Sequence, residues 1–267
     1  MQIKDDHMKT RIGRYVKVVS LLCMCLFALQ TNCYAHFPWI NVLDYTPETG
    51  AGLKMTLNWG HAYPFSDFLK KSATESVSLN GPGNDSLGID YVSEVMLASK
   101  ETITTPGTYI VSAVRKPGFY TKTKKGGKRS SKQGLEHVIK CSFSQMSMKA
   151  VVNAGNVNGP ADRVLGHPME IVPLKNPGNL RSGDDLPIWI LLDGKPYSGT
   201  FFATYAGFST QKETFAYASK TDKKGLGNLK ILTSGVWVIK AVHEQPYPDK
   251  TQCDSQSFIA TLTFQIN

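Results

Sequence analysis

The sequence predicts an all-β protein of two immunoglobulin-like antiparallel sandwich domains that follow an N-terminal signal peptide. Three observations predict this class: short segments in which apolar and polar residues alternate, turn-rich stretches between them, and a scarcity of long runs with helical periodicity. The 23 glycines and 14 prolines supply the many turns that such a fold requires. No pattern of strands alternating with crossover helices is found, which disfavours a parallel sheet.

The first 35 residues read as a cleaved secretory signal. A basic segment (9–17) precedes an apolar run (18–29), and Cys33 and Ala35 are the small residues expected three positions and one position before the cut. The apolar run is shorter than the roughly 20 residues that span a bilayer as a helix. We therefore expect a periplasmic or secreted protein whose mature chain begins at His36.

Candidate strands recur along the mature chain. In its first half they cover residues 53–59, 76–79, 91–97 and 107–114, and one moderate helical pattern covers 130–142. In its second half they cover residues 169–173, 186–192, 200–205, 214–218, 235–242 and 258–266. Asp193-Gly194 is typical of a two-residue hairpin turn, and the segment 221–225 is typical of a polar loop in which Gly225 takes a positive φ.

A stretch of Asn, Gly and Pro over residues 153–162 indicates a junction rather than an element. We place one sandwich domain over residues 36–158 and a second over 159–267. Only two cysteines, Cys141 and Cys253, remain in the mature chain. In an oxidising compartment they fit either one disulfide or two unpaired buried thiols, and the spacing does not decide between these.

The formal net charge is +9, and the signal accounts for five basic and two acidic groups of this balance, so +6 remains. Six cations within a Gly- and Ser-rich stretch, 121–133, account for that remainder. No aromatic residues interleave these lysines as single-stranded nucleic-acid binding would favour, so we expect no nucleic-acid partner. This basic loop is either a solvated excursion or a weak contact with an anionic envelope surface.

Several motifs, in order along the mature chain, carry a family resemblance: Ala35-His36-Phe37-Pro38-Trp39, Trp59-Gly60-His61, Gly166-His167-Pro168-Met169 and Gly235-Val236-Trp237 leading to His243. With these motifs the chain resembles the DUF4198 family. That family is similar to the periplasmic components of nickel and cobalt uptake systems. The resemblance implies a metal-binding protein, not an enzyme, whose partners are the membrane components of a metal transporter.

Four histidines are candidate metal ligands. A mature terminus at His36 offers a free amine and Nδ1 of the same residue, which together chelate one ion. His61 and His243 each follow a predicted strand, and His167 stands in a family-like motif. A nitrogen-rich set of this kind suits Ni²⁺ or Co²⁺ first, with Cu²⁺ or Zn²⁺ as alternatives.

Two other functions stay open. The same terminal histidine and a second imidazole would form a copper histidine brace, as in oxidases that cleave polysaccharides. A metal-free adhesion or scaffold module is the third reading, because tandem sandwiches often serve as spacers. The chain has no Gly-x-Ser-x-Gly elbow and no His-Glu-x-x-His pair, so the sequence shows no motif of a hydrolytic enzyme.

Overall fold

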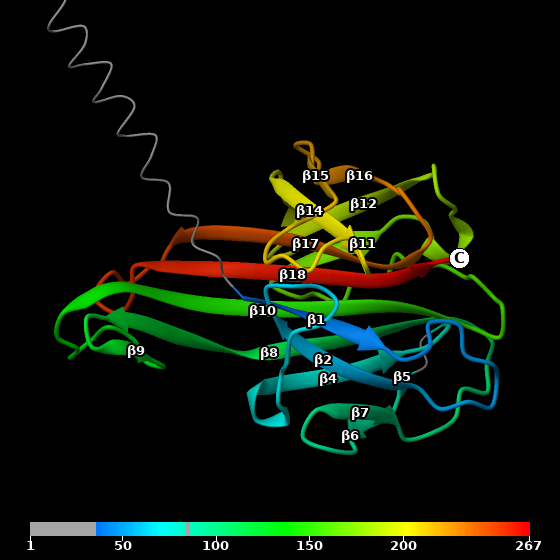
Figure 1. Ribbon diagram of the computed structural model, residues 1–267, viewed down its shortest axis with the longest axis horizontal. Coiled ribbons are helices and arrows are strands. Elements are labelled where there is room, and N and C mark those ends of the chain that lie inside the picture. Colours follow the sequence, from blue (N-terminus) through cyan, green and yellow to red (C-terminus); the bar gives the residue numbers. More distant parts are fainter. Residues whose placement is uncertain (1–35, 84–85) are drawn as a thin grey trace, which may run out of the picture. The chain divides into compact units, whose positions relative to one another are not determined.

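One nine-stranded sheet organises the protein (Figure 1). The computed structural model describes residues 36–83 and 86–267, and the predicted signal lies outside them. Along the sheet the order is β15-β14-β17-β18-β10-β8-β4-β5, with β9 added to β8. These strands are β4 (Thr74–Asn80), β5 (Ser86–Leu87), β8 (Gly107–Thr123), β9 (Gly126–Lys128), β10 (Val138–Ala154), β14 (Thr200–Tyr205), β15 (Tyr217–Lys220), β17 (Gly235–Pro246) and β18 (Ser255–Ile266).

Two smaller sheets pack against this central sheet. The first is β1 (Phe37–Val42), β2 (Lys54–Gly60), β3 (Asp67–Phe68), β6 (Ile89–Tyr91) and β7 (Met96–Ser99). The second is β11 (Met169–Pro173), β12 (Asp185–Leu192), β13 (Lys195–Pro196) and β16 (Leu226–Lys230). Two short 3-10 turns complete the described elements, at Lys71–Ala73 and Pro177–Asn179.

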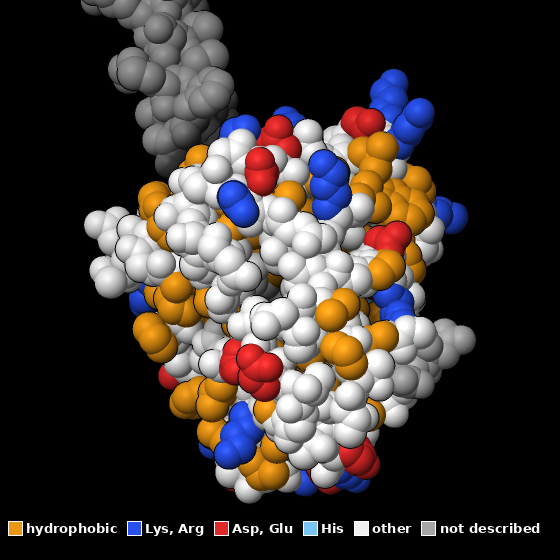
Figure 2. Space-filling model, turned by 90° about the vertical axis from the view of Figure 1, so that its right-hand side faces the viewer, with side chains coloured by type: hydrophobic (Ala, Val, Ile, Leu, Met, Phe, Trp, Pro, Cys, Tyr) orange, Lys and Arg blue, Asp and Glu red, His pale blue; other side chains and the backbone are white. Residues whose placement is uncertain are grey.

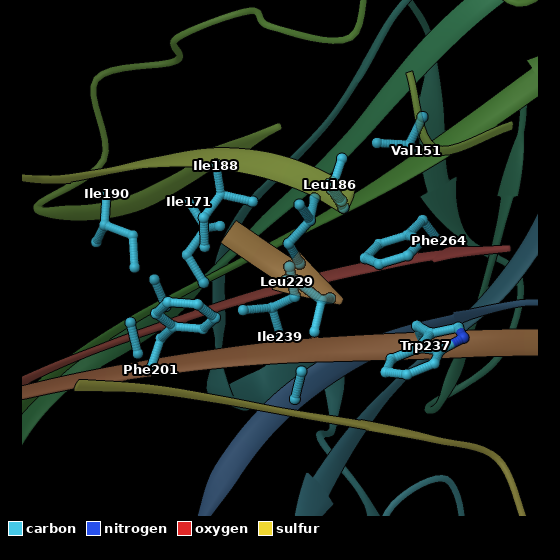
Figure 3. Packing of buried hydrophobic residues seen from close by; sticks show 14 of the residues in the cluster. Val151, Ile171, Leu186, Ile188, Ile190, Phe201, Leu229, Trp237, Ile239 and Phe264 are labelled. Atoms are coloured by element: carbon cyan, nitrogen blue, oxygen red, sulfur yellow. The ribbon is translucent and has the colours of Figure 1, made fainter. Parts of the chain in front are cut away.

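The central sheet carries a separate core on each face, because successive side chains of a strand point to opposite sides. Val111 of β8 packs with the first small sheet, whereas Ile110 packs with the second. Phe264 of β18 belongs to the core under the second small sheet (Figure 3). Burial on both faces explains why the long strands contain continuous apolar runs rather than clean alternation.

The all-β antiparallel sandwich class is confirmed, with one local exception. β10 and β18 run parallel over Ser142↔Ser255 to Ala150↔Thr263, whereas the other strand pairs within the described residues are antiparallel. Residues His36–Asn267 form a single compact unit. Strands from both sides of residue 158 share the central sheet, and the division into separate folding domains there stays a prediction.

The turn chemistry predicted from the sequence is confirmed. Asp193 and Gly194 both have positive φ, 48° and 71°, between β12 and β13, as the commonest two-residue hairpin requires. Gly225 also has a positive φ of 76°, and Asp222 Oδ1 accepts hydrogen bonds from the backbone N–H of Lys224 and Leu226.

Three predicted elements were wrong or shifted. No α-helix forms over 130–142, because Gly134 and His137 adopt left-handed φ and β10 begins at Val138. The predicted strand 91–97 is a hairpin, since Ser93 Oγ accepts from Met96 N at 3.1 Å and the chain reverses between β6 and β7. The strand predicted at 214–218 begins only at Tyr217.

A long arm extends the central sheet past the small sheets (Figure 1). It consists of the distal parts of β8 and β10 with β9 along its edge. Cys141 and Cys253 form a disulfide across 112 residues, which joins β10 to the connection between β17 and β18. The disulfide alternative is thus confirmed. In the described part of the chain, no helix has the length and apolarity needed to cross a bilayer.

Candidate metal centre

His36 and His61 face each other because of strand register. β1 pairs antiparallel with β2, and its first rung joins Phe37 to Gly60. The residues one step beyond that rung, His36 and His61, are therefore opposite one another. Their ring centroids lie 3.9 Å apart.

Trp59 supports the His36 ring from the same side of the strand pair. Trp59 is two residues before His61, so both side chains lie on one face of β2. The rings of His36 and Trp59 are stacked, with centroids 5.4 Å apart and planes 8° from parallel. The Arg115 guanidinium lies 4.9 Å from the Trp59 ring centroid, which continues the stack as a cation–π contact.

A largely buried carboxylate fixes the orientation of His61. Glu213 Oε1 lies 2.9 Å from His61 Nδ1, and the Glu213 N–H donates to the His61 carbonyl at 2.8 Å. The second oxygen, Oε2, accepts from Lys240 Nζ at 2.8 Å. A carboxylate in an ion pair only accepts, so the neutral imidazole must carry its proton on Nδ1. His61 Nε2 is then left with a free lone pair for a ligand.

Lys240 is held among aromatic rings, which keeps Glu213 in place. Its ammonium lies 4.3 Å from the Phe37 ring centroid and 5.2 Å from that of Phe215. Only 7% of the Lys240 side chain is exposed. Burial lowers the pKa of Lys240, and the hydrogen bond and charge of Glu213 oppose that shift.

The environment also favours a neutral imidazole at His36. The pKa of His36 is lowered from 6.5, first because its ring is partly removed from solvent and second because His61 is close. The carboxylates Asp67 and Glu213 oppose this shift without reversing it. An imidazole that stays neutral keeps the lone pair that a transition metal requires.

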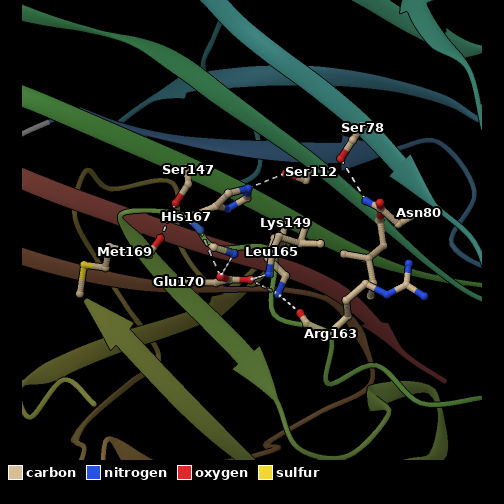
Figure 4. Close-up of polar contacts among 12 residues, drawn as sticks. Ser78, Asn80, Ser112, Ser147, Lys149, Arg163, Leu165, His167, Met169 and Glu170 are labelled. Carbon is tan, nitrogen blue, oxygen red and sulfur yellow. Dashed lines mark hydrogen bonds and ion pairs between the residues drawn. The ribbon is translucent and has the colours of Figure 1, made fainter. Parts of the chain in front are cut away.

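His167 lies in a different network, with Ser112 and Glu170 (Figure 4). Its Nε2 is 2.9 Å from Ser112 Oγ. Glu170 accepts from the backbone N–H of Leu165, Gly166 and His167, and it forms an ion pair with Lys149 at 2.9 Å. Burial lowers the pKa of His167, and its Nδ1 is buried without a hydrogen-bond partner among the described residues.

Burial alone would raise the pKa of Glu170, but the charge and hydrogen bond of Lys149 outweigh burial and hold the pKa below its ordinary value. Both side chains are almost fully buried, with 2% of Lys149 and 1% of Glu170 exposed. Lys149 also donates to the Arg163 carbonyl at 2.8 Å. This pair therefore ties β10 to β11 inside the protein.

His243 does not join His36 and His61 either. It lies three residues after Lys240 on β17, and strand alternation turns its side chain to the opposite face of the sheet. There its ring contacts Tyr197 and Phe258, and Nε2 lies 3.1 Å from Gln245 Oε1. The structure thus brings together two of the four histidines expected as ligands and separates the other two from them.

The sequence did not indicate Glu213 or Lys240. Glu213 lies in a loop without a motif, 152 residues from its partner His61. Lys240 could have been recognised from the sequence. A lysine inside the apolar run of β17 needs a charged or polar partner when it is buried. Among residues 36–83 and 86–267, no group of three or more His, Cys, Asp or Glu side chains is arranged to hold a metal.

Comparison with known proteins identifies a family. The family model described as a domain of unknown function, DUF4198, matches residues 33–245. No curated protein matches the chain significantly.

Solved structures that resemble the chain are distant. They include a DUF4785 family protein from Legionella pneumophila (9% identity, TM-score 0.23, covering 81% of this chain and 53% of that one). Another is the ectodomain of mouse nectin-like molecule 4 (13%, TM-score 0.17, 86% and 64%). A third is the three N-terminal domains of the bacteriophage RB49 outer capsid protein Hoc (12%, TM-score 0.20, 85% and 59%). The chain thus spans between about half and two thirds of each of these structures.

Proposed function

The chain belongs to the DUF4198 family, and from that premise we propose that the mature protein binds one divalent transition-metal ion at His36 and His61. Ni²⁺ or Co²⁺ is the proposed ion, and the membrane components of an uptake system are the proposed recipients. The observation that carries the proposal is the pair of imidazoles with centroids 3.9 Å apart, one of them oriented by a largely buried carboxylate.

The donor chemistry supports such an ion. Cleavage after Ala35 gives His36 a free amine, which adds a third nitrogen beside its Nδ1 and the free Nε2 of His61. Three neutral nitrogens suit Ni²⁺, Co²⁺, Cu²⁺ or Zn²⁺ and do not suit Mg²⁺ or Ca²⁺, which prefer oxygen ligands. The amine is a backbone group, so it adds to the ligands that side chains provide.

The residues that contact His61 support the same assignment. A ligand histidine commonly donates its other N–H to a carboxylate, which fixes the ring and makes the ligating nitrogen more basic. Glu213 is placed for this role, and its ion pair with Lys240 holds it in position. The protein would bind, carry and release the ion without chemical change, which is why we assign transport rather than catalysis.

Metal titration of the exported protein tests this function. The protein is produced with its own signal, intact mass verifies that the chain begins at His36, and calorimetric titrations with Ni²⁺, Co²⁺, Cu²⁺ and Zn²⁺ follow. We expect one equivalent of Ni²⁺ or Co²⁺ to bind. His61→Ala should lower the affinity by at least the roughly 10–100-fold lost when a residue that only hydrogen-bonds to a metal ligand is removed.

His243→Ala is the matched control, because His243 is half-buried on the opposite face and should leave the affinity unchanged. Equal affinities of His61→Ala and the parent would contradict the proposal, as would an absence of any bound metal, which favours the metal-free scaffold. The copper brace uses the same two histidines. Binding of copper alone, together with peroxide-driven cleavage of a polysaccharide, would favour that function instead.

The pH dependence separates the amine from the imidazoles. Each proton that binds a ligand nitrogen removes its lone pair, so metal affinity falls as pH decreases through the pKa of that nitrogen. With a free amine, the affinity should begin to fall below about pH 8, by roughly tenfold per pH unit. His36 should add to the slope only below 6.5, because its pKa is lowered. Calorimetry across this range measures both steps, and an affinity that is flat down to about pH 5 would exclude nitrogen ligands.

A further inference from the structure

The arm formed by β8, β9 and β10 carries an unbalanced positive charge. Seven basic side chains lie between Lys122 and Lys140, and two of them have acidic partners: Lys132 pairs with Asp254, and Lys140 pairs with Glu244 at 3.1 Å. The other five form no ion pair within the described residues and are exposed, namely Lys122, Lys124, Lys125, Lys128 and Arg129. By contrast, the end of the protein remote from the arm shows acidic and basic side chains interspersed (Figure 2).

The same arm exposes two large apolar side chains beside these cations. Tyr120 is 52% exposed and Ile139 is 57% exposed. Tyr120 lies on the outward face of β8 with Lys122, and its ring rests over Gly127, where any side chain would collide with it. Ile139 lies in the bulge of β10 between Val138 and Lys140. Tyrosine and lysine with an aliphatic neighbour are the residues that anchor proteins at the boundary between water and lipid.

Several contacts tie the backbone of the arm together and so define where these side chains start. Its root is closed by the disulfide between Cys141 and Cys253. Phe119 and Phe143 pack against each other, and both meet Tyr247 edge to face. Threonine hydroxyls within the tip bond to the Ser130 and Gly126 carbonyls. Little backbone conformational entropy is then lost when the surface binds.

We infer that the arm is a docking surface for an anionic phospholipid membrane, to which its five unpaired cations and two exposed apolar side chains bind together. Anionic headgroups attract the cations, and Tyr120 and Ile139 enter the interfacial region. A soluble polyanion would use the cations alone and leave both apolar side chains in water. A single-stranded nucleic acid would need several aromatic platforms for its bases, and the exposed face of the arm has only Tyr120.

Membrane binding by the arm would be a function separate from metal binding. It would also determine where the histidine pair lies relative to the bilayer. Arg115, which stacks on Trp59, and Tyr120 both lie on β8. The same strand therefore leads from the histidine pair to the arm. A membrane-bound arm would hold the histidine pair near the bilayer in which a transporter resides.

Vesicle binding of the metal-free mature protein tests the inference independently of the metal site. The probe is a set of vesicles with equal parts of phosphatidylglycerol and phosphatidylcholine, compared with vesicles of phosphatidylcholine alone. We expect co-sedimentation with the anionic vesicles only, weakening as salt shortens the Debye length. Changing the five unpaired cations to Gln should lower binding at least ~100-fold, since each cation near an anionic surface is worth roughly fivefold.

The matched control changes five exposed lysines elsewhere to Gln and gives the same net charge: Lys175, Lys195, Lys220, Lys223 and Lys224. It should bind vesicles like the parent, and an equal loss in both variants would overturn the inference. A second variant, Tyr120→Ser with Ile139→Ser, should weaken vesicle binding while leaving binding to dextran sulfate unchanged. If this variant binds vesicles like the parent, the surface takes a soluble polyanion and the membrane assignment is wrong.

Discussion

Lys149→Met should lower the free energy of unfolding by about 3–5 kcal/mol, because it leaves a buried carboxylate without its counter-charge. Glu170 would remain almost fully buried, with only backbone N–H groups to stabilise its charge. Urea denaturation of the parent and the variant measures the difference. The loss arises from the unpaired charge and not from the missing attraction, since an ion pair in a protein interior gains little over its own desolvation.

Two controls isolate the buried charge. Lys230→Met removes the same ammonium from an exposed pair with Asp185, in which the side chains are 46% and 53% exposed, and should cost no more than about 1 kcal/mol. The double variant Lys149→Met with Glu170→Gln should be less destabilised than the sum of the two single variants, because no charge is left buried. If Lys149→Met and Lys230→Met cost the same, the interior pair has no special role.

Retention of a single residue before His36 should lower the affinity for Ni²⁺ or Co²⁺ by roughly 100-fold or more. The reason is that the amine and Nδ1 of His36 no longer chelate the ion together. When Ala35 stays attached, the nitrogen of His36 is an amide, which has to lose its proton before it can bind the ion. The free amine then belongs to Ala35, so the chelate of amine and imidazole within His36 is lost. Calorimetric titration of the protein with and without Ala35 measures the change.

Thermal unfolding of both forms provides the control for this experiment. The added residue lies outside β1, which begins at Phe37, so the melting temperatures without metal should agree. Added metal should raise the melting temperature more for the form that begins at His36. Equal affinities of the two forms would mean that the amine is not a ligand and that the donors lie elsewhere.

The sequence predicted the fold class well because strand signals are local. Alternation and turn residues identified β2, β11, β12, β14, β17 and β18 nearly at their observed bounds. It failed where one side chain reverses the chain, as Ser93 does between β6 and β7. It also failed at residues 130–142, where an apparent helical period is spread over a turn and the start of β10.

Of the four histidines predicted as ligands, two lie together in the structure. Motifs identified His36 and His61, and the register of β1 on β2 explains why they meet. His167 and His243 carried equally suggestive motifs, but side-chain alternation turns His243 to the other face, and His167 is taken up by the network around Glu170. Which face a strand residue points to depends on the pairing of whole sheets, and no single segment encodes it.

The signal cleavage site predicted from the sequence lies immediately before β1, a deeply buried strand. Cleavage there would have to precede the docking of β1. Phe37 and Trp39 are 1% and 0% exposed, while a peptidase must grip extended chain on both sides of the bond it cuts. With a cut after Ala35, β1 has to remain undocked until processing is complete. The histidine pair requires β1 to lie against β2, so with that cut it would form only after processing.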